Sequence, residues 1–135
     1  MEMENATQTN RVILHREVTG GILGGALAVH TALGPGLLES AYRMCMAREL
    51  EMRGLAVRQE VPVPIRFKGM DLDCGYRLDL LVADAVVVEL KAVERLLPIH
   101  EAQVMTYMKL LDVRVGLLIN FNTVHLRDGI RRLVI

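Results

Sequence analysis

The N-terminal part of the chain contains two stretches in which apolar residues recur at helical spacing. Over residues 14–33, valine, leucine and isoleucine return every three or four positions, which is typical of a helix with one buried face. A Gly-Pro-Gly breaker at 34–36 ends this pattern, and a second helical pattern follows over residues 37–53. Residues 1–10 are polar and lack such a period, so we expect them to be disordered. The folded part is expected to be a single domain over residues 11–135.

After the second helix the apolar period changes from three or four to two, which predicts strands. The proline pair at positions 62 and 64 should place its strand at a sheet edge, because proline has no N–H to donate to a neighbouring strand. Strands are expected over 56–60, 61–67, 74–83 and 86–91, with a turn at 68–71.

The last third of the chain is predicted to return to a helix and then to the sheet. Pro98 introduces a helical pattern over residues 99–111, which leads into a buried apolar run over 113–121. Two short strands are expected over 123–127 and 130–135. The order α-α-β-β-β-β-α-β-β predicts a mixed α/β or α+β fold around one sheet.

Four glycines form a stripe of small residues within the first predicted helix, at positions 20, 21, 24 and 25. Glycine in a helix costs about 1 kcal/mol relative to alanine, so we expect the stripe to allow close packing of another element. That neighbour is either part of the same fold or a second copy of the chain. No strand precedes the stripe and no Gly-Lys-Ser/Thr follows it, which argues against a phosphate-binding loop.

Composition narrows the classes of function. Sixteen Lys and Arg balance sixteen Asp and Glu among 135 residues, which excludes the strong positive field of a protein that coats nucleic acid. Cys45 and Cys74 have no CxxC or histidine-rich neighbourhood, so neither a zinc ribbon nor a redox dithiol is expected. No membrane span or targeting segment is visible, and we expect a cytoplasmic protein that does not enter membranes.

The clearest chemical signal lies in the two predicted strands on either side of Asp84. Alternation places Arg77, Asp79, Glu89 and Lys91 on one face. In a hairpin centred on Asp84, residues whose numbers sum to 168 lie opposite each other, so Asp79 should face Glu89. The other, apolar face is then expected to hold Tyr76, Leu78, Leu80, Val82, Val86, Val88 and Leu90.

Two carboxylates placed about 5 Å apart on neighbouring strands are destabilising unless a cation lies between them. In one interpretation, Arg77 and Lys91 neutralise Asp79 and Glu89 and form a solvated charged patch. In the other, the two acids hold Mg²⁺ or Mn²⁺, which prefer carboxylate and phosphate oxygens, and Lys91 reaches into the same site. Such an ion would serve the hydrolysis of a phosphodiester. The spacing alone leaves both interpretations open.

Further polar residues occupy shared faces of the predicted helices. Glu39 and Tyr42 are three residues apart, and Gln103 and Tyr107 are four apart, so each pair lies on one side of its helix. Taken singly, each pair is explained as well by ordinary surface or interfacial packing.

These residues together resemble a known family. Segment 36–42, GLLESAY, fits the motif of the GxxExxY family of small bacterial and archaeal proteins. Asp79, followed by the tripeptide ELK at 89–91, resembles the core signature of the PD-(D/E)XK nuclease superfamily. With the Gln-x-x-x-Tyr at 103–107, the resemblance extends over about residues 18–121. One departure is a leucine, Leu78, in place of the superfamily's proline, and leucine suits a paired strand better.

The resemblance implies a restriction-endonuclease-like core, with a central mixed β-sheet flanked by helices. It implies a divalent-metal-dependent nuclease that hydrolyses phosphodiester bonds in DNA or RNA, with Mg²⁺ or Mn²⁺ as the cofactor. In this reading Asp79, Glu89 and Glu39 are metal ligands and act with Lys91 as the catalytic residues. The resemblance also implies that Gln103, Tyr107 and Tyr42 line the same cleft.

A second hypothesis is a catalytically silent module on the same fold that binds nucleic acid or protein. The chain has little room for a separate DNA-reading domain, and its neutral charge gives little non-specific affinity for phosphate. A homodimer or an assisting protein partner is expected in either case, since a duplex cutter needs two active centres or two encounters.

Overall fold

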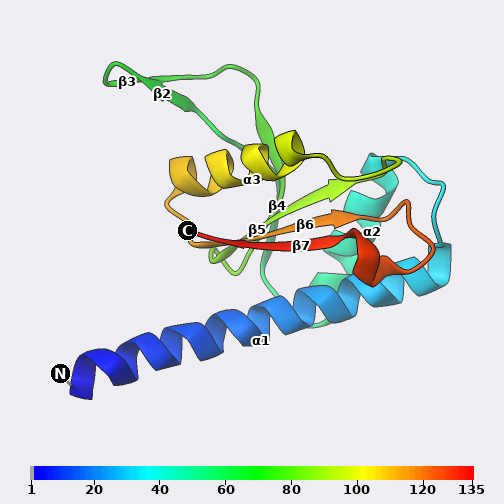
Figure 1. Ribbon diagram of the computed structural model, residues 1–135, viewed down its shortest axis with the longest axis horizontal. Helices are drawn as coiled ribbons and strands as arrows, with labels where there is room; N and C mark the ends of the chain where they lie inside the picture. Colours follow the sequence, from blue (N-terminus) through cyan, green and yellow to red (C-terminus); the bar gives the residue numbers. More distant parts are fainter. Residues whose placement is uncertain (1) are drawn as a thin grey trace.

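A computed structural model of the chain describes the backbone of residues 2–135 and the side chains of residues 15–135. Helix α1 (Glu2–Leu33) is followed by α2 (Glu39–Met52), and the two flank the same side of a central sheet (Figure 1). Helix α3 (Pro98–Leu111) covers the opposite face. The expected disorder over residues 1–10 concerns residues outside the described side chains and stays a prediction.

The central sheet has five strands in the order β1-β4-β5-β6-β7. Strands β5 and β6 run parallel, with α3 as their connection, and the other pairs are antiparallel, so the sheet is mixed. The expected edge position is confirmed, but the predicted strand over 61–67 is split: Pro62 ends β1 at one edge of this sheet, and residues 65–67 form a strand of a separate sheet. The bounds are β1 (Val57–Pro62), β4 (Arg77–Val82), β5 (Val86–Lys91), β6 (Val115–Asn120) and β7 (Ile130–Val134).

Helices on both faces of the sheet explain why its middle strands are apolar throughout. Every residue of β6 is buried, and β5 is buried up to Lys91, because neither strand has a solvated face. One core lies between the sheet and the first two helices, and a second lies between the sheet and α3. The predicted buried run over 113–121 is therefore a central strand.

The predicted register of the hairpin is confirmed, whereas part of the predicted face is wrong. Leu80 pairs with Val88, as the sum of 168 requires. However, Leu78 packs in the core beneath α3 instead of with Leu80, and Tyr76 is 45% exposed. The pairing of β1 with β4 skips Asp79, opposite a residue of β1 with positive φ, so regular alternation lapses there.

Three of the four stripe glycines pack against the end of α2 and the residues after it. A Cβ at Gly25 would lie 2.7 Å from a methyl of Leu50, and one at Gly24 would lie 2.8 Å from the Arg53 guanidinium. Gly21 is similarly close to a leucine side chain, but a Cβ at Gly20 would meet nothing within 4 Å. The element that packs on the stripe thus belongs to the same chain. The expected close packing is wrong only for Gly20.

Two predicted elements outside the central sheet differ in the structure. The predicted strand over 123–127 is a bend followed by the short 3₁₀ helix η1 (Leu126–Gly129), in which the N–H of Asp128 donates to the carbonyl of His125. The predicted turn at 68–71 is tighter than expected. Only Lys68 and Gly69 form it, both with positive φ, as a two-residue hairpin requires.

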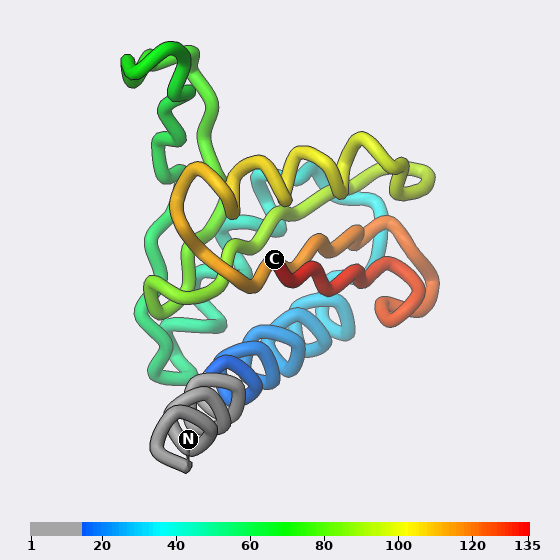
Figure 2. Tube along the Cα trace, turned by 60° about the vertical axis from the view of Figure 1, so that its left-hand side comes forward, coloured from blue at the N-terminus to red at the C-terminus, as the bar shows by residue number. Residues whose placement is uncertain are grey.

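The tight turn joins β2 (Ile65–Phe67) to β3 (Met70–Leu72), which form a separate two-stranded sheet. Figures 1 and 2 show this hairpin projecting from the body of the molecule on the side of α3. Within the described part of the chain, no helix combines the length and the apolar character needed to cross a membrane.

Candidate active site

The site begins where the backbone pairing of β4 and β5 stops. Beyond Leu80, side chains replace the ladder: the Asp79 N–H donates to Glu89 Oε1 at 2.8 Å, and the Leu90 N–H donates to Asp79 Oδ2 at 2.8 Å. Each carboxylate therefore binds the backbone of the opposite strand with one oxygen. These two hydrogen bonds hold the acids side by side. The second oxygen of each carboxylate takes no part in them.

Burial makes this pair of acids electrostatically unusual. Glu89 is only 4% exposed, and burial, together with the charge of Asp79, raises its pKa to about 8. Burial also raises the pKa of Asp79, although the hydrogen bond from Leu90 and the charge of Lys91 oppose the rise. Two such carboxylates are stabilised in their ionised form only when a cation neutralises them.

Lys91 is the cation that lies beside the pair. Its Nζ is 4.0 Å from Glu89 Oε2, and its side chain is largely buried. Arg77, the other cation of the solvated-patch interpretation, lies 3.5 Å from Asp73 and donates to the carbonyl of Tyr76. The four-charge surface patch is therefore not formed, because Glu89 is buried and Arg77 pairs elsewhere.

Glu39 stands apart from this pair, exposed in the first turn of α2. Its negative charge contributes to the raised pKa values of Asp79 and Glu89, after burial and nearer groups. Among residues 15–135, however, no three His, Cys, Asp or Glu side chains are grouped closely enough to hold a metal ion. The structure thus brings together Asp79, Glu89 and Lys91, and leaves Glu39 outside that group.

Tyr42 lies in the core instead of lining the expected cleft. It is fully buried, and its ring stacks on Phe121 with the centroids 4.4 Å apart. Its hydroxyl donates to the carbonyl of Gly34 and accepts from the N–H of Leu37 at 3.2 Å. Tyr42 therefore fixes the loop that leads into Glu39.

Asn120 is a supporting residue that the sequence reasoning missed. It is 1% exposed, its amide donates to the carbonyl of Val93 at 2.9 Å, and its Oδ1 accepts from the Val93 N–H at 3.1 Å. The N–H of Phe121 also donates to the carbonyl of Lys91 at 2.9 Å. These bonds fix the backbone on which Lys91 stands. The signal in the sequence that could have identified Asn120 is a single amide side chain at the end of the apolar run over 115–119.

Gln103 and Tyr107 lie on α3, which packs against β5. The Gln103 amide donates to the Tyr107 hydroxyl at 3.1 Å, so the predicted pair is in contact. Tyr107 is almost fully buried, and burial, followed by the negative charge of Glu89, raises its pKa. Tyr107 packs in the core beneath α3 together with Val87, and Glu89 lies on the same face of β5 as Val87, so α3 covers the face of the strand that carries Glu89.

The donor set suits a hard divalent cation. Asp79 and Glu89 each keep an oxygen outside the backbone exchange, and carboxylate oxygens are the ligands that Mg²⁺ and Mn²⁺ prefer. The desolvation of Glu89 gives a physical reason for a cation at this place. Two protein carboxylates are enough for Mg²⁺, which commonly completes its shell with water and substrate oxygens.

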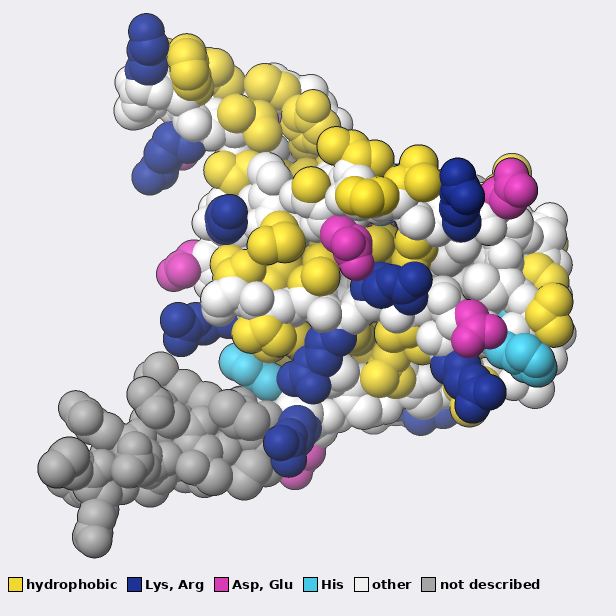
Figure 3. Space-filling view, in the orientation of Figure 1, with side chains coloured by type: hydrophobic (Ala, Val, Ile, Leu, Met, Phe, Trp, Pro, Cys, Tyr) yellow, Lys and Arg dark blue, Asp and Glu magenta, His cyan; other side chains and the backbone are white. Residues whose placement is uncertain are grey.

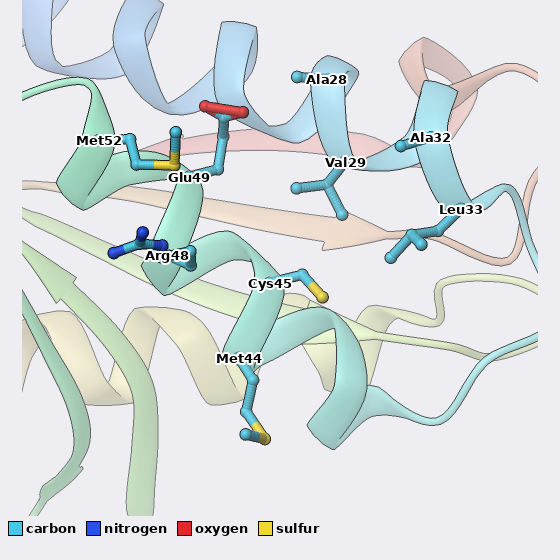
Figure 4. Close-up of a pocket in the computed structure, with 9 residues that line it drawn as sticks. All are labelled: Ala28, Val29, Ala32, Leu33, Met44, Cys45, Arg48, Glu49 and Met52. Carbon is cyan, nitrogen blue, oxygen red and sulfur yellow. The ribbon is translucent and has the colours of Figure 1, made fainter.

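A pocket of about 350 Å³ lies elsewhere, between α1 and α2 (Figure 4). Arg48 and Glu49 are its only charged lining residues, and the other lining side chains are apolar. None of the site residues described above borders it. Its lining therefore offers no arrangement of groups for hydrolysis.

A family model described as the PD-(D/E)XK nuclease superfamily matches residues 16–133, which is nearly the whole chain. No curated protein and no solved structure matches.

Proposed function

The chain belongs to the PD-(D/E)XK nuclease superfamily, and from this premise we propose that it hydrolyses phosphodiester bonds in DNA or RNA with a divalent metal ion. The superfamily is generally divalent-metal dependent, and the mixed sheet flanked by helices agrees with its restriction-endonuclease-like core. The GLLESAY segment at 36–42 supports the narrower assignment to the GxxExxY family.

The observation that carries this proposal is the buried pair of carboxylates, Asp79 and Glu89, each of which accepts a backbone N–H from the opposite strand. A charged patch that only kept the surface soluble would lie in water, whereas Glu89 is buried beside a second acid. Such an arrangement costs folding free energy, and it is typical of a functional site.

In this proposal Asp79 and Glu89 hold the ion. When bound, Mg²⁺ or Mn²⁺ lowers the pKa of a bound water and offsets the negative charge that develops on the phosphate. The Lys91 ammonium, next to Glu89, donates hydrogen bonds toward the attacking water and the reacting phosphate oxygens. Asn120 positions Lys91 by fixing the backbone beyond it, and Tyr42 positions the loop before Glu39. Glu39 then acts as an outer acid that adjusts the charge of the pair.

Substitution of the pair tests the proposal directly. With Mg²⁺ or Mn²⁺, we expect wild-type protein to cleave at least one of single-stranded, duplex or branched DNA or RNA. Asp79→Asn and Lys91→Ala should each lower the cleavage rate by about 100-fold or more, the scale of losing one preorganised electrostatic group. Asp84→Asn is the matched control, because Asp84 lies at the turn of the same hairpin and pairs with Arg58. It should cleave like wild type.

Calorimetry with Mn²⁺ separates this proposal from the silent binding module before any substrate is known. We expect wild type and Asp84→Asn to bind Mn²⁺, and Asp79→Asn to bind it much more weakly. Absence of binding at millimolar Mn²⁺, with the fold intact by circular dichroism, would favour the silent module. Cleavage that persists in both Asp79→Asn and Lys91→Ala would overturn the assigned site.

A further inference from the structure

A pocket beside the proposed active site has the chemistry of a nucleobase site. It measures about 410 Å³ and lies between the foot of the projecting hairpin and residues 99–107 of α3. Its lining includes Gln103 and Tyr107 of α3, the helix that covers the face of β5 on which Glu89 lies. We propose that this pocket takes an unpaired nucleobase of the substrate, an inference that rests on the proposed function.

The pocket wall is apolar and aromatic. Tyr76 and Tyr107 meet edge to face with their centroids 6.3 Å apart, and Ile65 and Ile99 extend the surface. Tyr76 is 45% exposed and Ile99 is 68% exposed, so this surface lies open to solvent. Figure 3 shows hydrophobic side chains continuing from the hairpin over α3. The exposed ring of Tyr76, backed by the buried ring of Tyr107, is the kind of surface on which a nucleobase stacks.

The polar groups of the pocket suit the edge of a base. The Gln103 amide uses one N–H on Tyr107, and its second N–H and its carbonyl oxygen provide a donor and an acceptor. His100 accepts the N–H of Leu97 on Nδ1, which places its proton on Nε2, directed away from that bond. Both residues lie on the same face of α3, at positions i and i+3.

The charges of the lining residues argue against a phosphate group as the ligand of this pocket. No Lys or Arg lines the pocket, and a phosphate would need such a partner. The balanced charge of the whole chain also provides little attraction for a continuous duplex backbone. A ring that stacks and bonds through its edge fits this lining better.

The substrate class follows from this occupant. A base within an intact duplex is paired and stacked, and reaching the pocket would cost a few kcal/mol of unstacking. Single strands, flaps and bulges avoid that cost. We therefore expect the substrate to have unpaired nucleotides next to the scissile phosphodiester.

Oligonucleotide binding tests the inference independently of cleavage. The probes are single strands of DNA and of RNA that contain 2-aminopurine, and the matching duplexes, with Ca²⁺ in place of Mg²⁺ to prevent turnover. We expect at least one single strand to bind about tenfold more tightly than its duplex. Tyr76→Ala should weaken that binding roughly 5- to 150-fold, the range for loss of one base–aromatic stack, and should abolish quenching of the 2-aminopurine.

Two control variants localise the effect. Tyr76→Phe keeps the ring and should bind within about twofold of wild type. Phe67→Ala removes an exposed aromatic residue from β2 of the same hairpin, outside the pocket, and should bind normally. Equal affinity for duplex and single strand, normal binding by Tyr76→Ala, an equal loss in Phe67→Ala, or no binding of any oligonucleotide would overturn the inference.

The outcomes also separate this inference from the proposed function. If wild type and Tyr76→Ala cleave duplex and single strand equally, the pocket inference fails and the nuclease assignment stands. If single strands bind through Tyr76 but no nucleic acid is cleaved, the nuclease assignment fails and the pocket inference stands.

Discussion

Asp79 and Glu89 close the end of the β4–β5 hairpin with their side chains. The Leu90 N–H is fully buried, so its hydrogen bond to Asp79 replaces the acceptor that a regular ladder would provide. Alanine at position 79 would leave that N–H without a partner, at a cost of about 1–3 kcal/mol. Asparagine keeps an acceptor oxygen, which is why Asp79→Asn is the better variant for separating activity from folding.

The raised pKa of Glu89 makes stability depend on pH. Its pKa is about 8 in the folded protein against an ordinary value of 4.5, so between these values the folded chain keeps a proton that the unfolded chain releases. The free energy of unfolding should therefore fall as the pH rises from about 4.5 to 8, and this contribution should level off above that range. Urea denaturation of wild type and Glu89→Gln across this range measures the effect.

We expect Glu89→Gln to remove this part of the slope, because glutamine does not titrate. Glu94→Gln, at an exposed acid on the following loop, serves as the control and should keep the wild-type slope. Parallel curves for wild type and Glu89→Gln would contradict the prediction.

The sequence predicted which acids meet but not how they are held. The register followed from the position of the turn at Asp84, because a hairpin pairs residues symmetrically about its centre. The bonds from each acid to the opposite backbone depend on the ladder stopping after Leu80, which alternation does not signal. The core position of Tyr42 depends on stacking with Phe121, a contact between residues distant in the sequence.

The packing of α1 against α2 gives a matched pair of glycine substitutions. Gly25→Ala would place a Cβ 2.7 Å from buried Leu50, so we expect a net loss of about 1–2 kcal/mol. Gly20→Ala meets nothing within 4 Å, and its better helix propensity should stabilise the protein by up to about 1 kcal/mol. Urea denaturation of both variants checks the opposite signs. Equal changes in the free energy of unfolding would mean that helix propensity alone determines the effect of alanine at these positions, and would contradict the prediction.

The helices and the long strands were predictable because their patterns are sustained, whereas the short elements were not. Strand β3 has three exposed residues and therefore no burial alternation to detect. The predicted strand over 123–127 bends because its polar groups bond locally, as when the Thr123 hydroxyl donates to the carbonyl of Asn120. A pattern of buried and exposed residues cannot identify elements that are this short and this exposed.

Charge balance across the whole chain sets an expectation for salt dependence. With no net charge, the protein should neutralise few phosphates, and the logarithm of oligonucleotide affinity should fall with log[KCl] at a slope of about −1 to −3. Fluorescence anisotropy at increasing KCl measures this slope, and an uncharged osmolyte at matched osmolality is the control. A slope steeper than about −6 would indicate an extended phosphate-binding track and contradict the expectation.

The order of the strands lay beyond the pattern of the sequence. Periodicity gave the strands but not the arrangement β1-β4-β5-β6-β7, which depends on long-range pairing. The parallel pairing of β5 with β6 follows from the α3 connection between them, since a crossover helix returns the chain to the same end of the sheet. This arrangement places Asn120 beside Lys91 on the neighbouring strand.

The hydrogen bonds that the two carboxylates accept from the backbone also constrain how the sequence of this protein can diverge. In a lineage that loses the reaction, position 79 must still provide an acceptor for the Leu90 N–H, and position 89 must provide one for the Asp79 N–H. Asparagine and glutamine are therefore the accessible replacements for the two acids. Lys91 gives no such support to a strand, so it is free to drift first. Inactive descendants should therefore have lost the lysine at position 91. They should keep a side-chain carbonyl at positions 79 and 89 and the asparagine at position 120.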